Sequence, residues 1–255
     1  MAGIFIEFPK VFLDDSSPMP LYYQLKEHIK EYIEQNGFSP GCQLPSEREL
    51  AEQFSLSRMT VRQATTSLVY EGVLYRRRGK GTFVSKPKII KDLQLSSFTE
   101  DMHSRGIQPS TRLLSMTVQP VTDSVAKKLG IDFNAKVIRI ERLRLANGEP
   151  MALELSTLPY DKFPGLEQID LARESLYKTL ENKFQVRVRR GWQSIEASLA
   201  TARESELLQI PEKAPVLLME RLTEGSEHGE IVEHVKSIYR GDKYKFRLEL
   251  SLRGG

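Results

Sequence analysis

The sequence predicts an α+β protein of two domains, because its features divide between two parts of the chain. Two short helical patterns and a basic hairpin occupy residues 44–84. The apolar pattern then lapses around Lys86, Pro87 and Lys88, and strand patterns with hairpin turns dominate the remainder. Strands joined by short turns favour an antiparallel sheet. A length of 255 residues allows each domain its own hydrophobic core.

The composition, 40% hydrophobic and 28% charged, is typical of a soluble globular protein. Although the net charge is only +3, residues 18–90 hold eleven Lys or Arg against seven acids, so the first domain carries the excess. Cys42 is the only cysteine, which predicts no internal disulfide and fits a reducing cytoplasm. The sequence has no apolar run of membrane-spanning length. Only His228 and His234 lie near each other in sequence, so neither a metal nor a cofactor is expected.

The first domain begins with a scaffold helix that Pro20 opens and Gly37 closes, after an N-terminal extension over residues 1–17. Ser46 and Glu49 form a capping box that predicts a second helix from Glu47. A third helix follows directly, capped by Ser57. Two helices in such close succession are typical of a pair whose second member enters the DNA major groove.

The reading helix would present Arg58, Thr60 and Arg62 near its start, away from its apolar face. Arginine at such a position can pair bidentately with guanine. After Gly72 the chain predicts a hairpin with a cationic, glycine-rich tip, and the window from residue 72 to residue 88 contains six Lys or Arg and no acid. Glycines let the backbone approach a groove, while the cations neutralise phosphates. A solvated basic loop is the alternative for the hairpin taken alone.

These three motifs together resemble the winged helix-turn-helix of GntR-superfamily transcription regulators. The matching segments are residues 45–51 (Pro-Ser-Glu-Arg-Glu-Leu-Ala), 57–64 (Ser-Arg-Met-Thr-Val-Arg-Gln-Ala) and 79–84 (Gly-Lys-Gly-Thr-Phe-Val). The resemblance implies that Arg48 and Arg58 read guanines, Arg62 holds DNA and Gly79 reaches the minor groove. The predicted DNA-binding residues are Arg48, Ser57, Arg58, Thr60, Arg62, Gly79, Lys80 and Gly81. The domain is expected over residues 18–85, with a linker at 86–96.

The second domain, expected over residues 97–255, contains a faint internal repeat at an offset of 79 residues. Residues 141–143 (Glu-Arg-Leu) match residues 220–222, and Glu154 matches Glu233. A duplicated strand-helix-hairpin unit follows from this, with both copies in one antiparallel sheet. Equivalent carboxylates would then line a pocket where the copies meet.

Arg142 and Arg144 lie two residues apart on one strand face, and burying both is costly unless an anion joins them. A structural ion pair with Glu141 or Glu154 is the alternative interpretation. Ser175 caps a predicted helix and can add a hydroxyl group and a helix N-terminus to a phosphate site. The turn at residues 147–148 decides the geometry: a two-residue turn places Glu154 on the opposite face from Arg142. A three-residue loop, or a bulge of equal effect, puts them opposite each other, and this is the register we predict.

The second half resembles the UTRA effector-binding domain of the HutC subfamily, whose fold is that of chorismate lyase. Residues 97–102, 142–147 and 236–242 are particularly similar to the repressors of N-acetylglucosamine utilisation. The resemblance implies a sugar-phosphate effector such as glucosamine-6-phosphate or N-acetylglucosamine-6-phosphate. Its phosphate would be held at Arg142, Arg144, Ser175 and Tyr177, and its sugar at Ser97, Phe98, Glu154, Glu233 and Tyr239.

The predicted function is therefore a ligand-controlled repressor that reads near-palindromic double-stranded operator DNA as a homodimer. One alternative keeps this regulator and changes the effector to urocanate or another sugar phosphate, although paired arginines favour phosphate. The other alternative is an active lyase, which tethering to a DNA-reading domain makes the weaker hypothesis. Measuring turnover of a candidate ligand discriminates it from a sensor.

Overall fold

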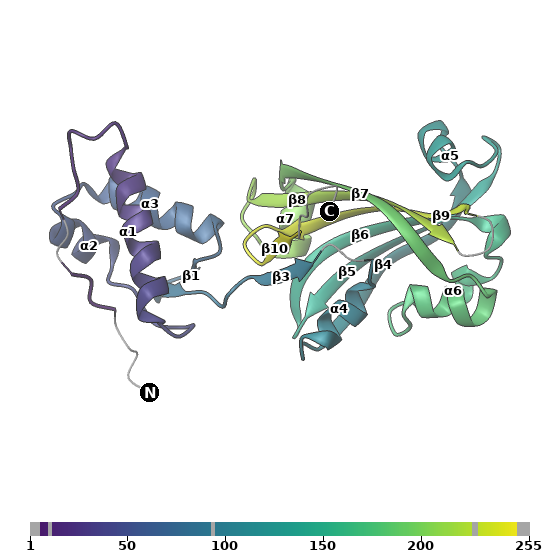
Figure 1. Ribbon diagram of the computed structural model, residues 1–255, viewed down its shortest axis with the longest axis horizontal. Helices are drawn as coiled ribbons and strands as arrows, with labels where there is room; N and C mark the ends of the chain where they lie inside the picture. Colours follow the sequence, from purple (N-terminus) through teal and green to yellow (C-terminus); the bar gives the residue numbers. More distant parts are fainter. Residues whose placement is uncertain (1–5, 10–11, 93–94, 226–228, 249–255) are drawn as a thin grey trace, which may run out of the picture. The chain divides into compact units, whose positions relative to one another are not determined.

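The computed structural model describes the chain apart from residues 1–5, 10–11, 93–94, 226–228 and 249–255 (Figure 1). Parts of the predicted N-terminal extension and linker, and His228, therefore lie outside the described residues. The chain forms two compact units, one comprising residues 1–89 and 241–245, the other residues 90–240 and 246–255. The first unit thus takes in a short segment far along the chain, which the sequence had assigned wholly to the second. Among the described residues, no helix is long and apolar enough to cross a membrane.

The first unit is a three-helix bundle with a hairpin. Its elements are α1 (Leu21–Asn36), α2 (Glu47–Phe54), α3 (Arg58–Tyr70), β1 (Leu74–Arg77) and β2 (Gly81–Val84). The predicted caps are present: Ser46 and Glu49 form the capping box of α2, and the Ser57 side chain accepts a hydrogen bond from the Thr60 amide. Gly72 has a φ of +73°, in the left-handed region expected where α3 stops.

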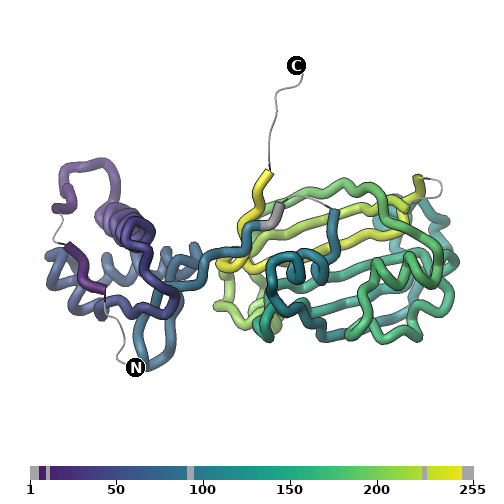
Figure 2. Tube along the Cα trace, turned by 60° about the horizontal axis from the view of Figure 1, so that its bottom comes forward, coloured from purple at the N-terminus to yellow at the C-terminus, as the bar shows by residue number. Residues whose placement is uncertain are grey.

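The second unit contains one six-stranded antiparallel sheet, in the order β4-β5-β6-β9-β8-β7 (Figures 1 and 2). The strands are β4 (Pro109–Pro120), β5 (Lys136–Ala146), β6 (Glu149–Pro159), β7 (Val188–Leu199), β8 (Pro215–Gly225) and β9 (Ile231–Arg240). The helices are α4 (Phe98–Ser104), α5 (Asp123–Leu129), α6 (Leu176–Phe184) and α7 (Ala202–Leu208), with the 3-10 turns η1 (Tyr160–Lys162) and η2 (Leu166–Gln168). Strands β3 (Ile89–Asp92) and β10 (Tyr244–Arg247) form a separate pair.

The predicted repeat is visible in this topology, because β4-α5-β5-β6 is followed by β7-α7-β8-β9 and the sheet order is symmetric about its centre. The two copies meet where β6 pairs with β9. Ser156 on β6 faces Val235 on β9 there, and these two positions are related by the predicted offset of 79 residues. The sheet therefore has an approximate twofold axis that passes between them.

A helix packs against each face of the sheet. Leu176 and Leu180 of α6 pack with Ile138 and Ile140 of β5 on one face. On the other face, Leu208 of α7 packs with the opposite side of the β5–β6 hairpin. Since Arg142 and Arg144 follow Ile140 at alternate positions, they project toward the α6 face.

The predicted register of the β5–β6 hairpin is confirmed. Arg142 pairs with Glu154 and Arg144 pairs with Ala152, after which the register shifts and Leu145 pairs with Pro150. The turn itself is the two-residue form, and a bulge at Met151 has the effect of the extra loop residue. Leu143, Leu145 and Leu153 share a cluster on the other face as expected, whereas Met151 is buried at the bulge outside that cluster.

Candidate nucleic-acid interface and ligand pocket

A concave surface on the first unit brings the reading helix and the hairpin together, with a volume of about 660 Å³. Arg48 at the start of α2 and Arg58 at the start of α3 line it, facing Gly79, Lys80 and Gly81 of the hairpin tip. All five are exposed to solvent. This arrangement leaves their cationic and backbone donor groups available to a nucleic-acid backbone or base edge.

The remaining predicted DNA-binding residues, Ser57, Thr60 and Arg62, are not among those that line this surface. Ser57 and Thr60 are joined by a side-chain hydrogen bond of 2.8 Å, so Ser57 serves as the helix cap. Arg62 is exposed on the next turn of α3. The sequence did not single out Arg76, which ties the hairpin to both helices through hydrogen bonds to Glu47 (2.9 Å), Thr65 (3.0 Å) and Thr66 (3.0 Å).

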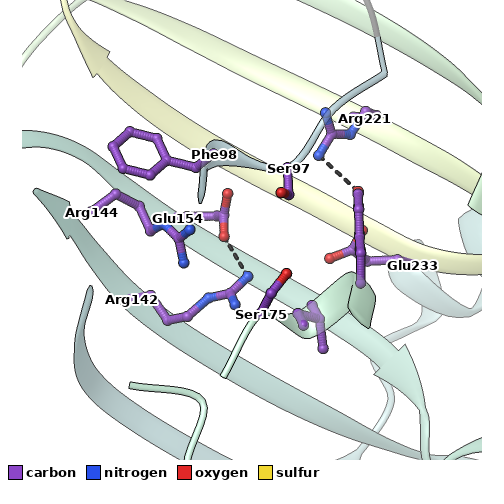
Figure 3. A pocket seen from close by; sticks show the side chains of 10 residues that line it. Ser97, Phe98, Arg142, Arg144, Glu154, Ser175, Arg221 and Glu233 are labelled. Atoms are coloured by element: carbon purple, nitrogen blue, oxygen red, sulfur yellow. Dashed lines mark hydrogen bonds and ion pairs between the residues drawn. The ribbon is translucent and has the colours of Figure 1, made fainter. Parts of the chain in front are cut away.

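The second unit contains a polar pocket on the α6 face of the sheet (Figure 3). Eight of the nine predicted effector residues line it: Ser97, Phe98, Arg142, Arg144, Glu154, Ser175, Tyr177 and Glu233. Tyr239 is the exception. It is buried at 5% exposure, and its ring meets that of Phe246 edge-on at 5.9 Å. Tyr239 lies on the same face of β9 as Glu233 but is not among the residues that line the pocket.

Arg142 forms a buried ion pair with Glu154 and a second hydrogen bond, of 3.3 Å, to the Ser156 hydroxyl group. One of the two structural pairings considered from the sequence is therefore present. The other is absent from the described contacts, because Glu141 instead accepts two hydrogen bonds from Arg203, of 2.7 and 2.9 Å. The Nε atom of Arg142 is buried without a hydrogen-bond partner among the described residues, so the guanidinium retains a donor for a ligand.

Arg144 is held from the α4 side of the pocket. Its guanidinium lies 4.8 Å from the centre of the Phe98 ring and donates a hydrogen bond of 3.2 Å to Thr99. Ser175 caps α6, yet its side chain accepts no capping hydrogen bond. Its hydroxyl group and the first amides of α6 are consequently available to an anion, and both lie at the pocket.

Sequence reasoning missed Arg221, a third arginine in the pocket wall. It lies at the position equivalent to Arg142 in the repeat, and this equivalence is the signal that identifies it. The second hairpin pairs differently, however: Arg221 faces Val235 while Thr223 faces Glu233. Arg221 therefore lies two residues along β8 from the position that faces Glu233.

The Tyr177 hydroxyl group bridges this gap. It donates a hydrogen bond of 2.9 Å to Glu233 and accepts one of 3.0 Å from Arg221. Burial raises the pKa of the Tyr177 hydroxyl group, and the charge of Glu233 raises it further. Although burial disfavours the Arg221 cation, the charges of its neighbours, Glu233 and Glu154 among them, outweigh that effect and raise its pKa. The phenol therefore stays protonated and the guanidinium stays charged.

The pocket thus holds three guanidinium groups against two carboxylates, within a free volume of only about 20 Å³. That space suits about one water molecule. A ligand with several heavy atoms would therefore require the lining side chains to move apart.

Comparison with known proteins identifies both units. Residues 21–84 match the model of the bacterial regulatory proteins of the gntR family, and residues 104–245 match the UTRA domain. The chain belongs to the GntR family of transcriptional regulators that carry a UTRA domain.

Among the described residues, no cluster of three or more His, Cys, Asp or Glu could hold a metal ion.

Several relatives match this chain over most of their length. The chain is 45% identical over 235 residues to the HTH-type transcriptional repressor NagR of Bacillus subtilis, covering 92% of this chain and 96% of NagR. It is 32% identical to the mannosyl-D-glycerate transport/metabolism system repressor MngR of Escherichia coli, covering 90% and 95%. The crystal structure of PhnF from Mycobacterium smegmatis superposes with a TM-score of 0.64 at 30% identity, covering 88% of this chain and all of PhnF.

Proposed function

We propose that this protein is a cytoplasmic, dimeric repressor of amino-sugar utilisation genes that a sugar phosphate releases from its operator. The observation that carries the proposal is the pocket, which brings Arg142, Arg144 and the uncommitted Ser175 hydroxyl group together opposite Glu154 and Glu233. Arginines with a helix N-terminus suit a phosphate, and carboxylates suit the hydroxyl or amino groups of a sugar. The similarity to NagR supports this assignment.

The DNA-reading half of the proposal rests on the concave surface of the first unit. Arg48 and Arg58 read base edges there, while Lys80 and the glycines of the hairpin tip contact the backbone. One such unit reads one half-site. A near-palindromic operator therefore requires a second copy of the chain, which light scattering of the purified protein measures directly.

Release follows if the effector favours an arrangement of the two units that the operator disfavours. Inside the pocket, the physical basis is the competition between ligand phosphate and Glu154 for Arg142. The strand that carries Glu233 ends at Arg240, immediately before the segment that belongs to the DNA-binding unit. The backbone therefore runs directly from the Glu233 strand into the DNA-binding unit.

The test uses an operator selected from random DNA by the purified protein. Glucosamine-6-phosphate and N-acetylglucosamine-6-phosphate are titrated into the complex in a gel-shift assay, alongside unphosphorylated glucosamine, glucose-6-phosphate and urocanate. We expect release by an amino-sugar phosphate and none by glucosamine. Release by urocanate alone would exclude the phosphate site, and conversion of any ligand into a product would favour the enzyme.

A further inference from the structure

The N-terminal segment around Ile6 and Phe8 is part of the DNA-binding unit's core, although it precedes the matched helix-turn-helix region at residues 21–84. Ile6 is 1% exposed and Phe8 is 6% exposed. The Phe8 ring packs on Tyr32 at 5.1 Å and on Phe54 at 6.3 Å. Burying two such apolar side chains stabilises the folded unit. The segment is therefore fixed to the bundle.

This segment is connected to the hairpin through residues 41–44. The Ile6 amide donates to the Gln43 carbonyl oxygen at 3.0 Å. On the other side, the Leu44 amide donates to the Thr82 carbonyl oxygen and the Val84 amide donates to the Cys42 carbonyl oxygen, each at 2.9 Å. Residues 41–44 thus extend the two-stranded hairpin and join it to the N-terminal segment.

The side chain of Gln43 continues this connection to the hairpin tip. Its Nε2 atom donates a hydrogen bond of 3.0 Å to the carbonyl oxygen of Lys80. Gly81, with a φ of +115°, approaches so closely that a Cβ atom there would lie 2.8 Å from the same Nε2 atom. Gln43 and Gly81 are therefore fitted to each other, and both line the concave DNA-binding surface.

At the tip itself, Gly79, Lys80 and Gly81 are exposed. Apart from the Gln43 side chain, the described contact at the tip is the turn hydrogen bond of 2.9 Å from the Lys80 amide to the Arg77 carbonyl oxygen, and Arg76 anchors only the base of the hairpin. A tip that moves freely loses that freedom on binding DNA, which weakens binding. Bracing the tip before binding removes this cost.

We propose that the segment around Ile6 and Phe8, acting through Gln43, is a brace that positions the hairpin tip for DNA. Gln43 is a positioning residue in this scheme, and the tip makes the contact. The inference rests on the DNA reading proposed above, and operator binding by the unmodified protein tests that function separately.

The experiment compares Gln43→Ala and Gln43→Glu with the unmodified full-length protein. Alanine removes the hydrogen bond to Lys80, and a carboxylate cannot donate it. We expect each variant to bind the selected operator about tenfold more weakly and to lose hydroxyl-radical protection where the tip lies. The protections made by α3 in the major groove should remain, and amide exchange at Leu44 and Val84 should accelerate. Phe12→Ala is the matched control, because Phe12 lies in the same N-terminal region and is fully exposed.

A second variant, Phe8→Ala, acts on the other end of the brace and should show the same selective loss at the tip. Binding within twofold of the unmodified protein by both folded Gln43 variants would overturn the proposal. Equal weakening of tip and major-groove protections would also overturn it, since the segment would then only stabilise the unit. Circular dichroism melting identifies any variant that fails to fold, and the remaining variants then decide the question.

Discussion

Both units place arginines at their candidate sites, but these arginines are exposed to solvent in the first unit and largely buried in the second. Arg48 and Arg58 stand in solvent on short helices, beside the residues that neighbour them in sequence. Arg142 is buried and Arg221 is half-buried, on strands about 80 residues apart. Arg142 pairs directly with Glu154, whereas Arg221 is linked to Glu233 through the Tyr177 hydroxyl group. An exposed arginine contributes little to stability, whereas a buried one must be paired. Substituting the exposed arginines of the first unit should therefore leave its stability unchanged, whereas substituting the paired residues of the pocket should also destabilise the second unit.

The largest expected effect is on the pocket's ion pair. Glu154→Ala leaves Arg142 buried without a carboxylate and should destabilise the second unit by roughly 3–5 kcal/mol, measured by urea denaturation. Arg203→Ala is the control, since Arg203 is largely exposed and its pair with Glu141 should be worth about 1 kcal/mol or less. Adding an amino-sugar phosphate should restore part of the loss, because its phosphate replaces the missing anion. Equal costs for the two substitutions would remove the distinction between the environments.

The second-largest expected effect is the loss of operator affinity when an exposed arginine is replaced. Arg58→Ala should weaken operator binding by about 1–3 kcal/mol and bring it closer to binding of random DNA, because the lost contact reads a base. Arg48→Ala should behave in the same way. Fluorescence anisotropy on both DNAs measures the difference, and thermal melting should stay unchanged. Parallel weakening on operator and random DNA would show that Arg58 contacts only the backbone.

Lys80 at the hairpin tip should have a smaller and less selective effect. Lys80→Ala removes one exposed cation, so it should weaken all DNA alike and make the slope of log affinity against log salt shallower by about one unit. The salt titration is run on operator and random DNA. A loss confined to the operator would instead assign base reading to the tip.

The contrast also explains what the sequence could predict. The helix pair and its caps are local, since Ser46 and Glu49 act within one turn, and their prediction needs no knowledge of the rest of the chain. The β5–β6 register was predictable because only one pairing places Arg142 beside Glu154 and keeps the leucines together. Both inferences use residues less than fifteen positions apart.

Features that depend on distant parts of the chain were missed. The repeat points to Arg221 as the equivalent of Arg142, but β8 and β9 pair two residues out of step with β5 and β6, and a sequence repeat does not show this separation of Arg221 from Glu233. The core role of Phe8 depends on packing against Tyr32 and Phe54, which no local pattern indicates. Tyr239 was placed at the effector site by resemblance; its ring packs against Phe246, near the end of the chain, and it is not among the residues that line the pocket.

The smallest expected effect is on the pH dependence of stability. It comes from a buried pair outside both sites, and tests whether a buried ionisable group there also depends on its partner. His234 lies on β9 at 4% exposure, with its Nε2 atom 2.8 Å from Glu220 and with Lys128 and Lys236 nearby. Burial lowers the pKa of His234 despite the hydrogen bond to Glu220, while contacts with Lys128 and His234 lower the pKa of Glu220 to about 2. Glu220 therefore stays ionised between pH 7 and pH 5.

Of this pair, only His234 titrates in that range; burial also lowers the pKa of His28 in the first unit, so His28 adds to the same dependence. Because the pKa of His234 is lower in the folded chain, the unfolded chain takes up a proton first as the pH falls below about 6.5. The stability present above that pH should decline toward pH 5, at no more than about 1.4 kcal/mol per pH unit for each histidine. His234→Asn keeps a donor toward Glu220 and should flatten the decline, whereas His103→Asn, at an exposed position, should leave it intact. Urea denaturation at pH 7.5, 6.5, 5.5 and 5.0 measures all three proteins. A decline that His234→Asn leaves unchanged would assign the pH dependence to other groups and confine the effect of burial to the pocket.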